Sequence, residues 1–155
     1  MPKRYNSTFQ YLYCFFRSIW INLKSITRSP SSNEEKYFEN FLTSYTKLEP
    51  QEKNSFDLFK GLWSTKIFDF QNTGEFDGFN DDRINWLLDE LGGAEGKKFL
   101  ELGPLEGAHT YMLESAGGDV LSIEGNHGAF LRCLIVKNFL GLKSKFLLGD
   151  FSNLD

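Results

Sequence analysis

A five-residue apolar stretch at 98–102 runs directly into a turn that contains Gly103 and Gly107, and this turn leads into a segment with helical spacing. A short apolar run that ends in such a turn is typical of a buried strand. The predicted elements are strand, helix, strand, helix and strand, at 98–102, 108–115, 120–124, 127–140 and 146–148. This alternation predicts an α/β fold with right-handed crossovers, namely the first three strands of a Rossmann-like, doubly wound parallel sheet.

The glycine turn is a candidate ligand loop. It lies at the carboxyl end of the first predicted strand, where doubly wound sheets bind their ligands. Gly103 and Gly107 allow a sharp turn and a close approach of a ligand to the backbone, and the helix behind them presents free N–H groups. A glycine pair alone is a weak signal, but its place between a strand and a helix strengthens it.

Acidic residues stand at the ends of all three predicted strands: Glu101, Glu124 and Asp150. A carboxylate at the end of the second strand can accept hydrogen bonds from the two hydroxyls of a ribose. Asp150 can accept a hydrogen bond from the exocyclic amine of adenine, and the ring of Phe151 can lie against the base. A solvated loop carboxylate explains any one of these acids, but three in register with a glycine loop predict an adenosine site.

From Phe99 to Asp155 the sequence resembles the cofactor-binding half of class I S-adenosylmethionine-dependent methyltransferases. The first loop of that family usually reads acid-x-Gly-x-Gly-x-Gly, and here Leu105 replaces the middle glycine. The resemblance implies that S-adenosyl-L-methionine is the cofactor, with Glu101 serving its amino group through the loop, Glu124 its ribose and Asp150 its adenine. The candidate cofactor-binding residues are Glu101, Gly103, Pro104, Gly107, Glu124, Gly125, Asn126, Asp150 and Phe151.

Two other classes of protein remain as alternatives. An NAD(P)-dependent oxidoreductase uses the same half-fold, but its fingerprint needs a third glycine where His109 stands, and Glu101 before the first glycine favours the methyltransferase. The other alternative is a non-catalytic module that binds the cofactor or a partner. Binding of S-adenosylhomocysteine compared with NAD distinguishes the two enzyme classes.

Several nearby residues have two explanations each. His109 and Thr110 either contact the carboxylate of the ligand or cap the helix that they open. Asn126 either caps the following helix or lies beside the adenine. Trp63 either covers the cofactor or belongs to the core.

The chain is divided into a basic, aromatic amphipathic helix at 1–30, a helical and irregular lead-in that covers the cofactor at 31–96, and the incomplete cofactor domain at 97–155. Residues 1–30 carry five basic and no acidic side chains, so the rest of the chain has a net charge of −9. This acidic body argues against a broad nucleic-acid-binding face. The apolar stripe at 9–26 contains Arg17 and Lys24, so we expect it to pack on protein or to lie on a membrane surface, and not to span a membrane.

In the lead-in, we expect a helix from about residue 34 to Leu48, an irregular segment at 51–80, and a helix capped by Asn80 and closed by Gly92. The two cysteines, Cys14 and Cys133, have no metal-binding or redox spacing. We therefore expect reduced thiols in a cytoplasmic protein without a metal site.

The methyl acceptor is not predicted, and a small molecule and tRNA both remain candidates. The layout of Leu62-Trp63-Ser64, Asp81–Trp86 and Phe130–Cys133 is similar to methyltransferases that modify the wobble uridine of tRNA. A domain of this family continues through a fourth strand, whose end and following loop carry substrate and catalytic residues. The chain ends at Asp155, so its catalytic residues are unknown. We expect no turnover by the chain alone, and self-association through the exposed edge of its first strand.

Overall fold

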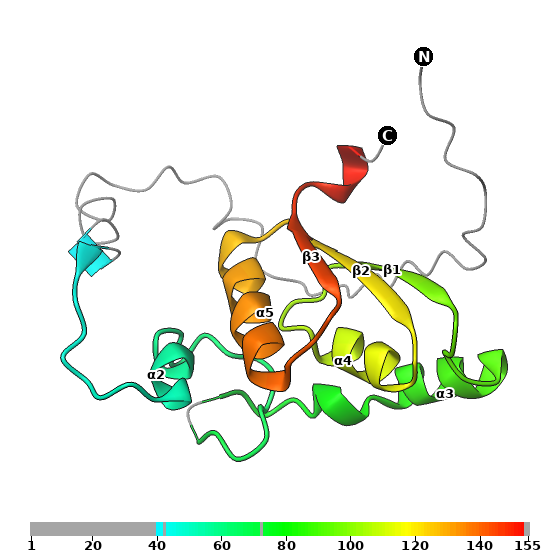
Figure 1. The fold of residues 1–155 in the computed structure, drawn as a ribbon, viewed down its shortest axis with the longest axis horizontal. Coiled ribbons are helices and arrows are strands. Elements are labelled where there is room, and N and C mark those ends of the chain that lie inside the picture. Colours follow the sequence, from blue (N-terminus) through cyan, green and yellow to red (C-terminus); the bar gives the residue numbers. More distant parts are fainter. Residues whose placement is uncertain (1–39, 42, 72, 154–155) are drawn as a thin grey trace. The chain divides into compact units, whose positions relative to one another are not determined.

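The structure is a computed structural model that describes residues 40, 41, 43–71 and 73–153. The described residues fall into two compact units, one that contains 51–71 and 73–153 and one that contains 40, 41 and 43–50. The three strands and the helices from α2 (Glu52–Asp57) onward belong to the first unit (Figure 1). The amphipathic stripe predicted at 9–26 lies outside the described residues.

A sheet of three parallel strands forms the centre of the first unit (Figure 1). In spatial order the strands are β1 (Lys98–Leu102), β2 (Asp119–Glu124) and β3 (Lys145–Leu148). The whole of β1 pairs with β2, and β3 pairs with residues 121–124 of β2. The predicted α/β fold with three parallel strands in this order is confirmed. Because the strands are parallel, their carboxyl ends meet at one edge of the sheet.

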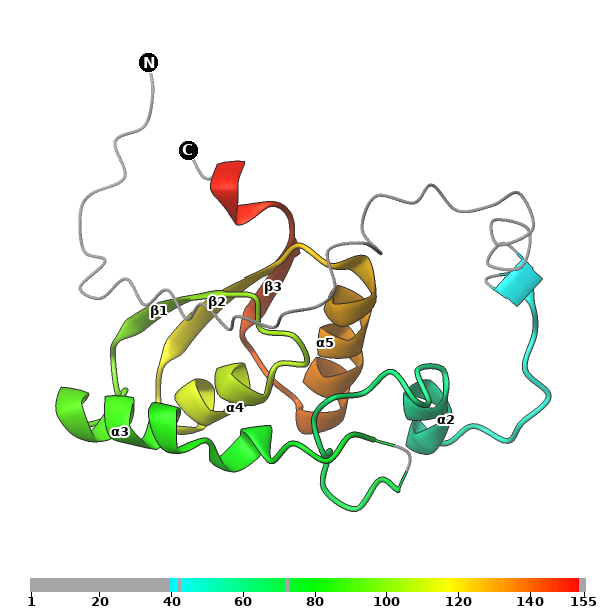
Figure 2. The same cartoon turned by 180° about the vertical axis from the view of Figure 1, so that it is seen from behind.

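Two helices connect the strands: α4 (Ala108–Ser115) and α5 (His127–Leu140). They have the bounds that the hydrophobic spacing predicts. Phe99, Val120 and Phe146 are buried among residues of these helices. Both helices therefore cover the same face of the sheet, as Figures 1 and 2 show. This arrangement leaves the β1–α4 turn at the edge where the strands end.

Between residue 51 and the sheet, the described chain forms three short helices: α2 (Glu52–Asp57), the 3-10 helix η2 (Gly78–Asn80) and α3 (Asp82–Leu91). The cap of α3 is Asp81, whose carboxylate accepts a hydrogen bond from the N–H of Arg83 at 2.9 Å. The prediction that Asn80 caps this helix is wrong by one residue, because Asn80 belongs to η2. The predicted end is confirmed, since Gly92 adopts a left-handed φ of 64°.

The prediction of an irregular segment at 51–80 holds only between α2 and η2, because these two helices lie within that range. The irregular part has a core of its own. Its aromatic side chains pack on α5 in a cluster that contains Phe56, Trp63, Ile67, Phe70, Val136 and Phe139. The rings of Phe56 and Phe70 stack with their centroids 4.1 Å apart. The cluster therefore fastens the lead-in to the helix that follows β2.

The helix predicted from about residue 34 ends earlier than expected. Helical backbone stops at Thr43, so the extension to Leu48 is wrong. The Ser44 hydroxyl and amide both bond to the carbonyl of Phe41, which offers the backbone an alternative to the next helical turn. Tyr45 is 95% exposed. Without burial of its apolar face, a short helix gains little stability.

Candidate cofactor-binding site

The turn between β1 and α4 has a left-handed backbone at three positions. The φ angle is 73° at Gly103, 58° at Leu105 and 75° at Gly107. These are the three positions at which the acid-x-Gly-x-Gly-x-Gly pattern has glycine. A residue with a side chain adopts this conformation at a cost of roughly 1–2 kcal/mol. Leu105 therefore keeps the backbone shape of the pattern at an energetic cost that a glycine would avoid.

The two glycines of the turn have different surroundings. A β-carbon on Gly103 would meet no atom within 4 Å, whereas one on Gly107 would lie 3.3 Å from Cζ of Phe146. A side chain at position 107 is thus disfavoured by its close approach to Phe146 as well as by the φ angle. Gly103 is exposed and borders open space, and Pro104 beside it is buried. The open side of the turn at Gly103 is therefore accessible to a ligand.

Glu124, at the end of β2, points its carboxylate at this turn. One oxygen accepts a hydrogen bond from the N–H of Leu105 at 3.0 Å, and the other accepts one from the N–H of Asn126 at 2.8 Å. The residue is only 7% exposed. A carboxylate offers about four acceptor positions, so about two remain beyond these bonds. Glu124 can thus hold the loop and still accept hydrogen bonds from a ligand.

Glu101 lies on the helix-facing side of β1, buried beneath the turn. Its carboxylate accepts hydrogen bonds from the hydroxyls of Thr110 and Ser122, the latter at 2.9 Å. Burial raises the pKa of Glu101, and the two hydroxyl bonds act in the opposite direction. The predicted role of Glu101, which acts on a ligand through the loop, stays a prediction.

Asp150 and Phe151 follow β3 and are exposed. The Asp150 carboxylate accepts hydrogen bonds from the hydroxyl and the N–H of Ser152, at 2.7 and 2.9 Å, and these bonds lower its pKa. Phe151 opens the 3-10 helix η3 (Phe151–Asn153). Because β2 and β3 are parallel neighbours, these residues share the sheet edge of Glu124. Their contact with adenine stays a prediction.

Gly125 and Asn126 connect this edge to α5. The side-chain oxygen of Asn126 accepts a hydrogen bond from the N–H of Ala129 at 2.9 Å, so Asn126 caps the helix. A β-carbon on Gly125 would lie 3.6 Å from the carbonyl oxygen of Gly149. The chain ends of β2 and β3 therefore lie side by side at the predicted site.

Glu106 is the residue of the turn that sequence reasoning missed. Its side chain is fully buried and accepts hydrogen bonds from the N–H groups of Ser64 and Thr65, at 3.0 and 2.7 Å. It also accepts one from Nε of Arg132 at 3.0 Å. The signal in the sequence was Arg132, a charged residue in the largely apolar segment of α5. These bonds join the glycine turn to both the lead-in and α5.

The structure shows the contacts of His109, Thr110 and Trp63, for which the sequence left a ligand contact and a structural role both open. His109 and Thr110 do not cap α4, which begins after Gly107 without a side-chain cap. Thr110 is buried and its hydroxyl donates a hydrogen bond to Glu101. Nε2 of His109 lies 3.0 Å from the carboxylate of Asp81. Trp63 is a core residue, since it is 7% exposed and its indole N–H donates to a backbone carbonyl within the lead-in.

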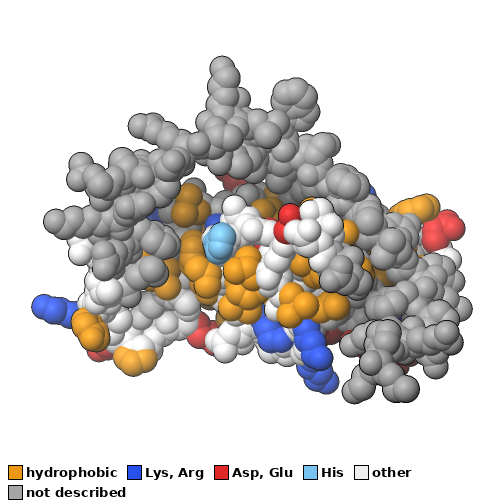
Figure 3. Space-filling view, turned by 90° about the horizontal axis from the view of Figure 1, so that it is seen from above, with side chains coloured by type: hydrophobic (Ala, Val, Ile, Leu, Met, Phe, Trp, Pro, Cys, Tyr) orange, Lys and Arg blue, Asp and Glu red, His pale blue; other side chains and the backbone are white. Residues whose placement is uncertain are grey.

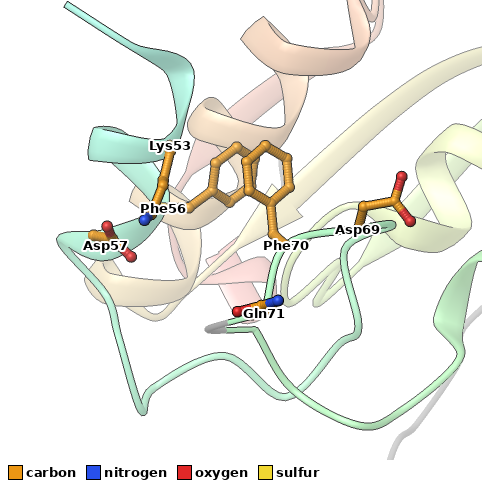
Figure 4. Close-up of a pocket in the computed structure, with 6 residues that line it drawn as sticks. All are labelled: Lys53, Phe56, Asp57, Asp69, Phe70 and Gln71. Carbon is orange, nitrogen blue, oxygen red and sulfur yellow. The ribbon is translucent and has the colours of Figure 1, made fainter.

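Figure 3 shows apolar side chains in a band across the described part of the upper face, with Lys and Arg side chains beside the band. Figure 4 shows a separate hollow of about 190 Å³ on the lead-in. It is lined by Lys53, Phe56, Asp57, Asp69, Phe70 and Gln71. None of the candidate cofactor residues lines it. The glycine turn therefore remains the candidate site.

Two features are absent from the part of the chain that the structure describes. No group of three or more His, Cys, Asp or Glu side chains there could hold a metal ion. Of the helices in the described ranges, none combines the length and the apolar character needed to cross a membrane.

Comparison with protein-family models and with curated proteins gives no match. Solved structures do match. The N-terminal domain of EvdMO1 with S-adenosylhomocysteine (SAH) bound aligns with a TM-score of 0.55 and 23% identity, over 67% of this chain and 46% of that chain. The structure of EvdMO1 itself aligns with a TM-score of 0.53 and 26% identity, over 67% of this chain and 24% of that chain.

A third structure, the N-terminal domain of EvdMO1 in the presence of SAH and D-fucose, aligns with a TM-score of 0.52 and 26% identity, over 67% of this chain and 45% of that chain. The chain thus spans just under half the length of that domain. These likenesses show the fold. The described sheet and its helices form a partial Rossmann-like fold, as predicted, which resembles the fold of the N-terminal domain of EvdMO1.

Proposed function

We propose that this chain binds S-adenosyl-L-methionine and forms the cofactor-binding part of a methyltransferase. The observation that carries the proposal is the buried carboxylate of Glu124, which bonds to the left-handed turn at Leu105 and retains unused acceptor positions. When bound, the cofactor supplies a methyl group activated by a positively charged sulfonium. The SAH-bound domain of EvdMO1 has a related fold, which supports the proposal.

The residues of the site fit the parts of this cofactor. Glu124 would accept hydrogen bonds from the two ribose hydroxyls, and the backbone at Gly103 would face the methionine portion. Asp150 would accept a hydrogen bond from the adenine amine, with Phe151 against the base. Glu101 would favour the amino group of the ligand electrostatically, through the turn. These assignments need no movement of the sheet, because all of them lie at or next to its carboxyl edge.

The charge at the site favours this cofactor over NAD. Among the described residues, no ion pair neutralises Glu101 or Glu124. A ligand with a cationic sulfonium and an ammonium group is attracted by these carboxylates, whereas the pyrophosphate of NAD is repelled by them. The charges of Glu101 and Glu124 thus favour S-adenosyl-L-methionine over NAD, as the glycine pattern of the turn does.

The acceptor is a separate part of the proposal. We infer methyl transfer to either a small molecule or tRNA, and the cofactor site itself does not select between them. Transfer of labelled methyl groups from S-adenosyl-L-methionine to each class of acceptor distinguishes the two.

Calorimetric titration of the purified chain with SAH tests the cofactor proposal. We expect saturable one-to-one binding, which Gly103→Arg abolishes because the new side chain fills the open side of the turn. Gly141→Arg is the matched control, since Gly141 also has a left-handed φ, 66°, a β-carbon there also meets no atom within 4 Å, and Gly141 lies at the end of α5, away from the turn. Equal binding by the unsubstituted chain and by Gly103→Arg would contradict the assignment.

A further inference from the structure

We propose that Glu106 is a positioning residue, which keeps the turn at Leu105 in the shape that aims Glu124 at the cofactor. The Glu106 clamp consists of its carboxylate, the N–H groups of Ser64 and Thr65, and Nε of Arg132. The inference rests on the proposed function and adds a determinant of cofactor affinity that does not itself touch the cofactor.

The clamp fixes Glu106 from two sides. Its side chain has 0% exposure and that of Arg132 has 10%. The guanidinium of Arg132 also lies over the rings of Phe59 and Trp63, at 5.7 and 5.9 Å from their centroids. A buried carboxylate that loses such partners is strongly disfavoured, so the clamp has little freedom to open. Glu106 is thus held in place by the aromatic core of the lead-in.

Glu106 directly follows the strained position in the turn. Leu105 has a φ of 58° with a bulky side chain, a conformation that persists only when its surroundings enforce it. The N–H of Leu105 donates to Glu124, so the conformation of Leu105 decides whether that bond forms. The chain of contacts therefore runs from Arg132 through Glu106 and Leu105 to Glu124.

A second carboxylate provides a matched control. Glu114 accepts hydrogen bonds from two consecutive N–H groups, those of Lys143 and Ser144, at 2.8 and 2.7 Å. These bonds lie at the start of β3, at the opposite edge of the sheet from the glycine turn. Glu114→Gln thus disturbs the same kind of contact without touching the proposed site.

The experiment measures SAH affinity for the full chain and for the variants Glu106→Gln, Glu114→Gln and Glu106→Gln with Leu105→Gly. We expect Glu106→Gln to weaken binding roughly 5- to 150-fold, the usual range for coupled sites. Glu114→Gln should stay within about twofold, and Leu105→Gly should restore part of the loss because glycine adopts a positive φ without strain. Loss without any recovery would mean that Glu106 only stabilises the fold, and would overturn the inference.

Amide hydrogen exchange supplies a readout that does not depend on the ligand. We expect Glu106→Gln to speed exchange at Leu105, whose N–H bonds to Glu124 and not to Glu106, as well as at Ser64 and Thr65. Unchanged exchange at Leu105 would overturn the inference. If Glu106→Gln does not fold, Arg132→Lys, which keeps the charge but loses the Nε bond, takes its place with the same criteria. Failure of the unsubstituted chain to bind SAH would instead refute the proposed function.

Discussion

Replacement of Glu124 by Ala removes the acceptor that the proposed site depends on most. Two of its acceptor positions hold the N–H groups of Leu105 and Asn126, and about two remain for ribose hydroxyls. A hydrogen bond to a charged group makes a net contribution of about 1.5–3 kcal/mol. When the carboxylate is removed from an open site, water can bond to the ribose hydroxyls instead, which reduces the loss of binding free energy. We therefore expect SAH binding to weaken by about 1–3 kcal/mol, which corresponds to a factor of roughly 5–150.

The assay is calorimetric titration with SAH, together with urea unfolding of each variant to confirm that it is folded. Glu124→Gln serves as an intermediate, because its amide oxygen can still accept a hydrogen bond from Leu105 or from a ribose hydroxyl. We expect its affinity to lie between those of the unsubstituted chain and Glu124→Ala. Folded Glu124→Ala protein with unchanged affinity would refute the reasoning.

Three further results are expected. Burial raises the pKa of Glu101, so the folded state holds the carboxyl proton of Glu101 to higher pH than the unfolded state does. The free energy of unfolding should therefore fall as the pH rises above 4.5, the ordinary pKa of a Glu side chain. Urea unfolding should show a weaker fall in Glu101→Gln. Gly74→Ala should destabilise the fold by roughly 1–3 kcal/mol in thermal unfolding, because the new β-carbon at position 74 would lie 2.1 Å from the backbone of Ser64. Gly149→Ala should change stability by about zero, because a β-carbon at position 149 meets no atom within 4 Å. Among the described strands, β1 pairs only with β2, so the hydrogen-bonding groups along the other side of β1 have no strand partner. We propose that the chain self-associates through this side of β1. A single monomeric species at all concentrations in sedimentation equilibrium would contradict this.

The sheet and its connecting helices could be predicted because their signals are local. Apolar runs between glycines defined the three strands, and the spacing of apolar residues gave α4 and α5 with their observed bounds. Gly92 and Gly141 adopt left-handed backbone at the ends of α3 and α5, which is the conformation that makes glycine a reliable helix terminator. The acids at the strand ends followed from the same strand positions.

Contacts between distant parts of the chain could not be predicted in the same way. Glu106 lies 42 and 41 positions from Ser64 and Thr65, and its partners are backbone N–H groups, which every sequence contains. Trp63 is in the core because α5 and the lead-in pack their aromatic residues together, a tertiary result that a local pattern does not encode. The early end of the helix at Thr43 has the same origin, since it depends on whether a partner buries the apolar face.

Mapping of SAH binding by NMR chemical shifts tests the central claim most directly. We expect SAH to shift the amide signals of Gly103, Leu105 and Gly125, at the carboxyl ends of the strands. Signals of Lys143 and Ser144, at the opposite edge, should stay unchanged, and NAD at the same concentration should shift none of them. Shifts caused by NAD but not by SAH, or SAH shifts confined to the opposite edge, would contradict a cofactor site at the glycine turn.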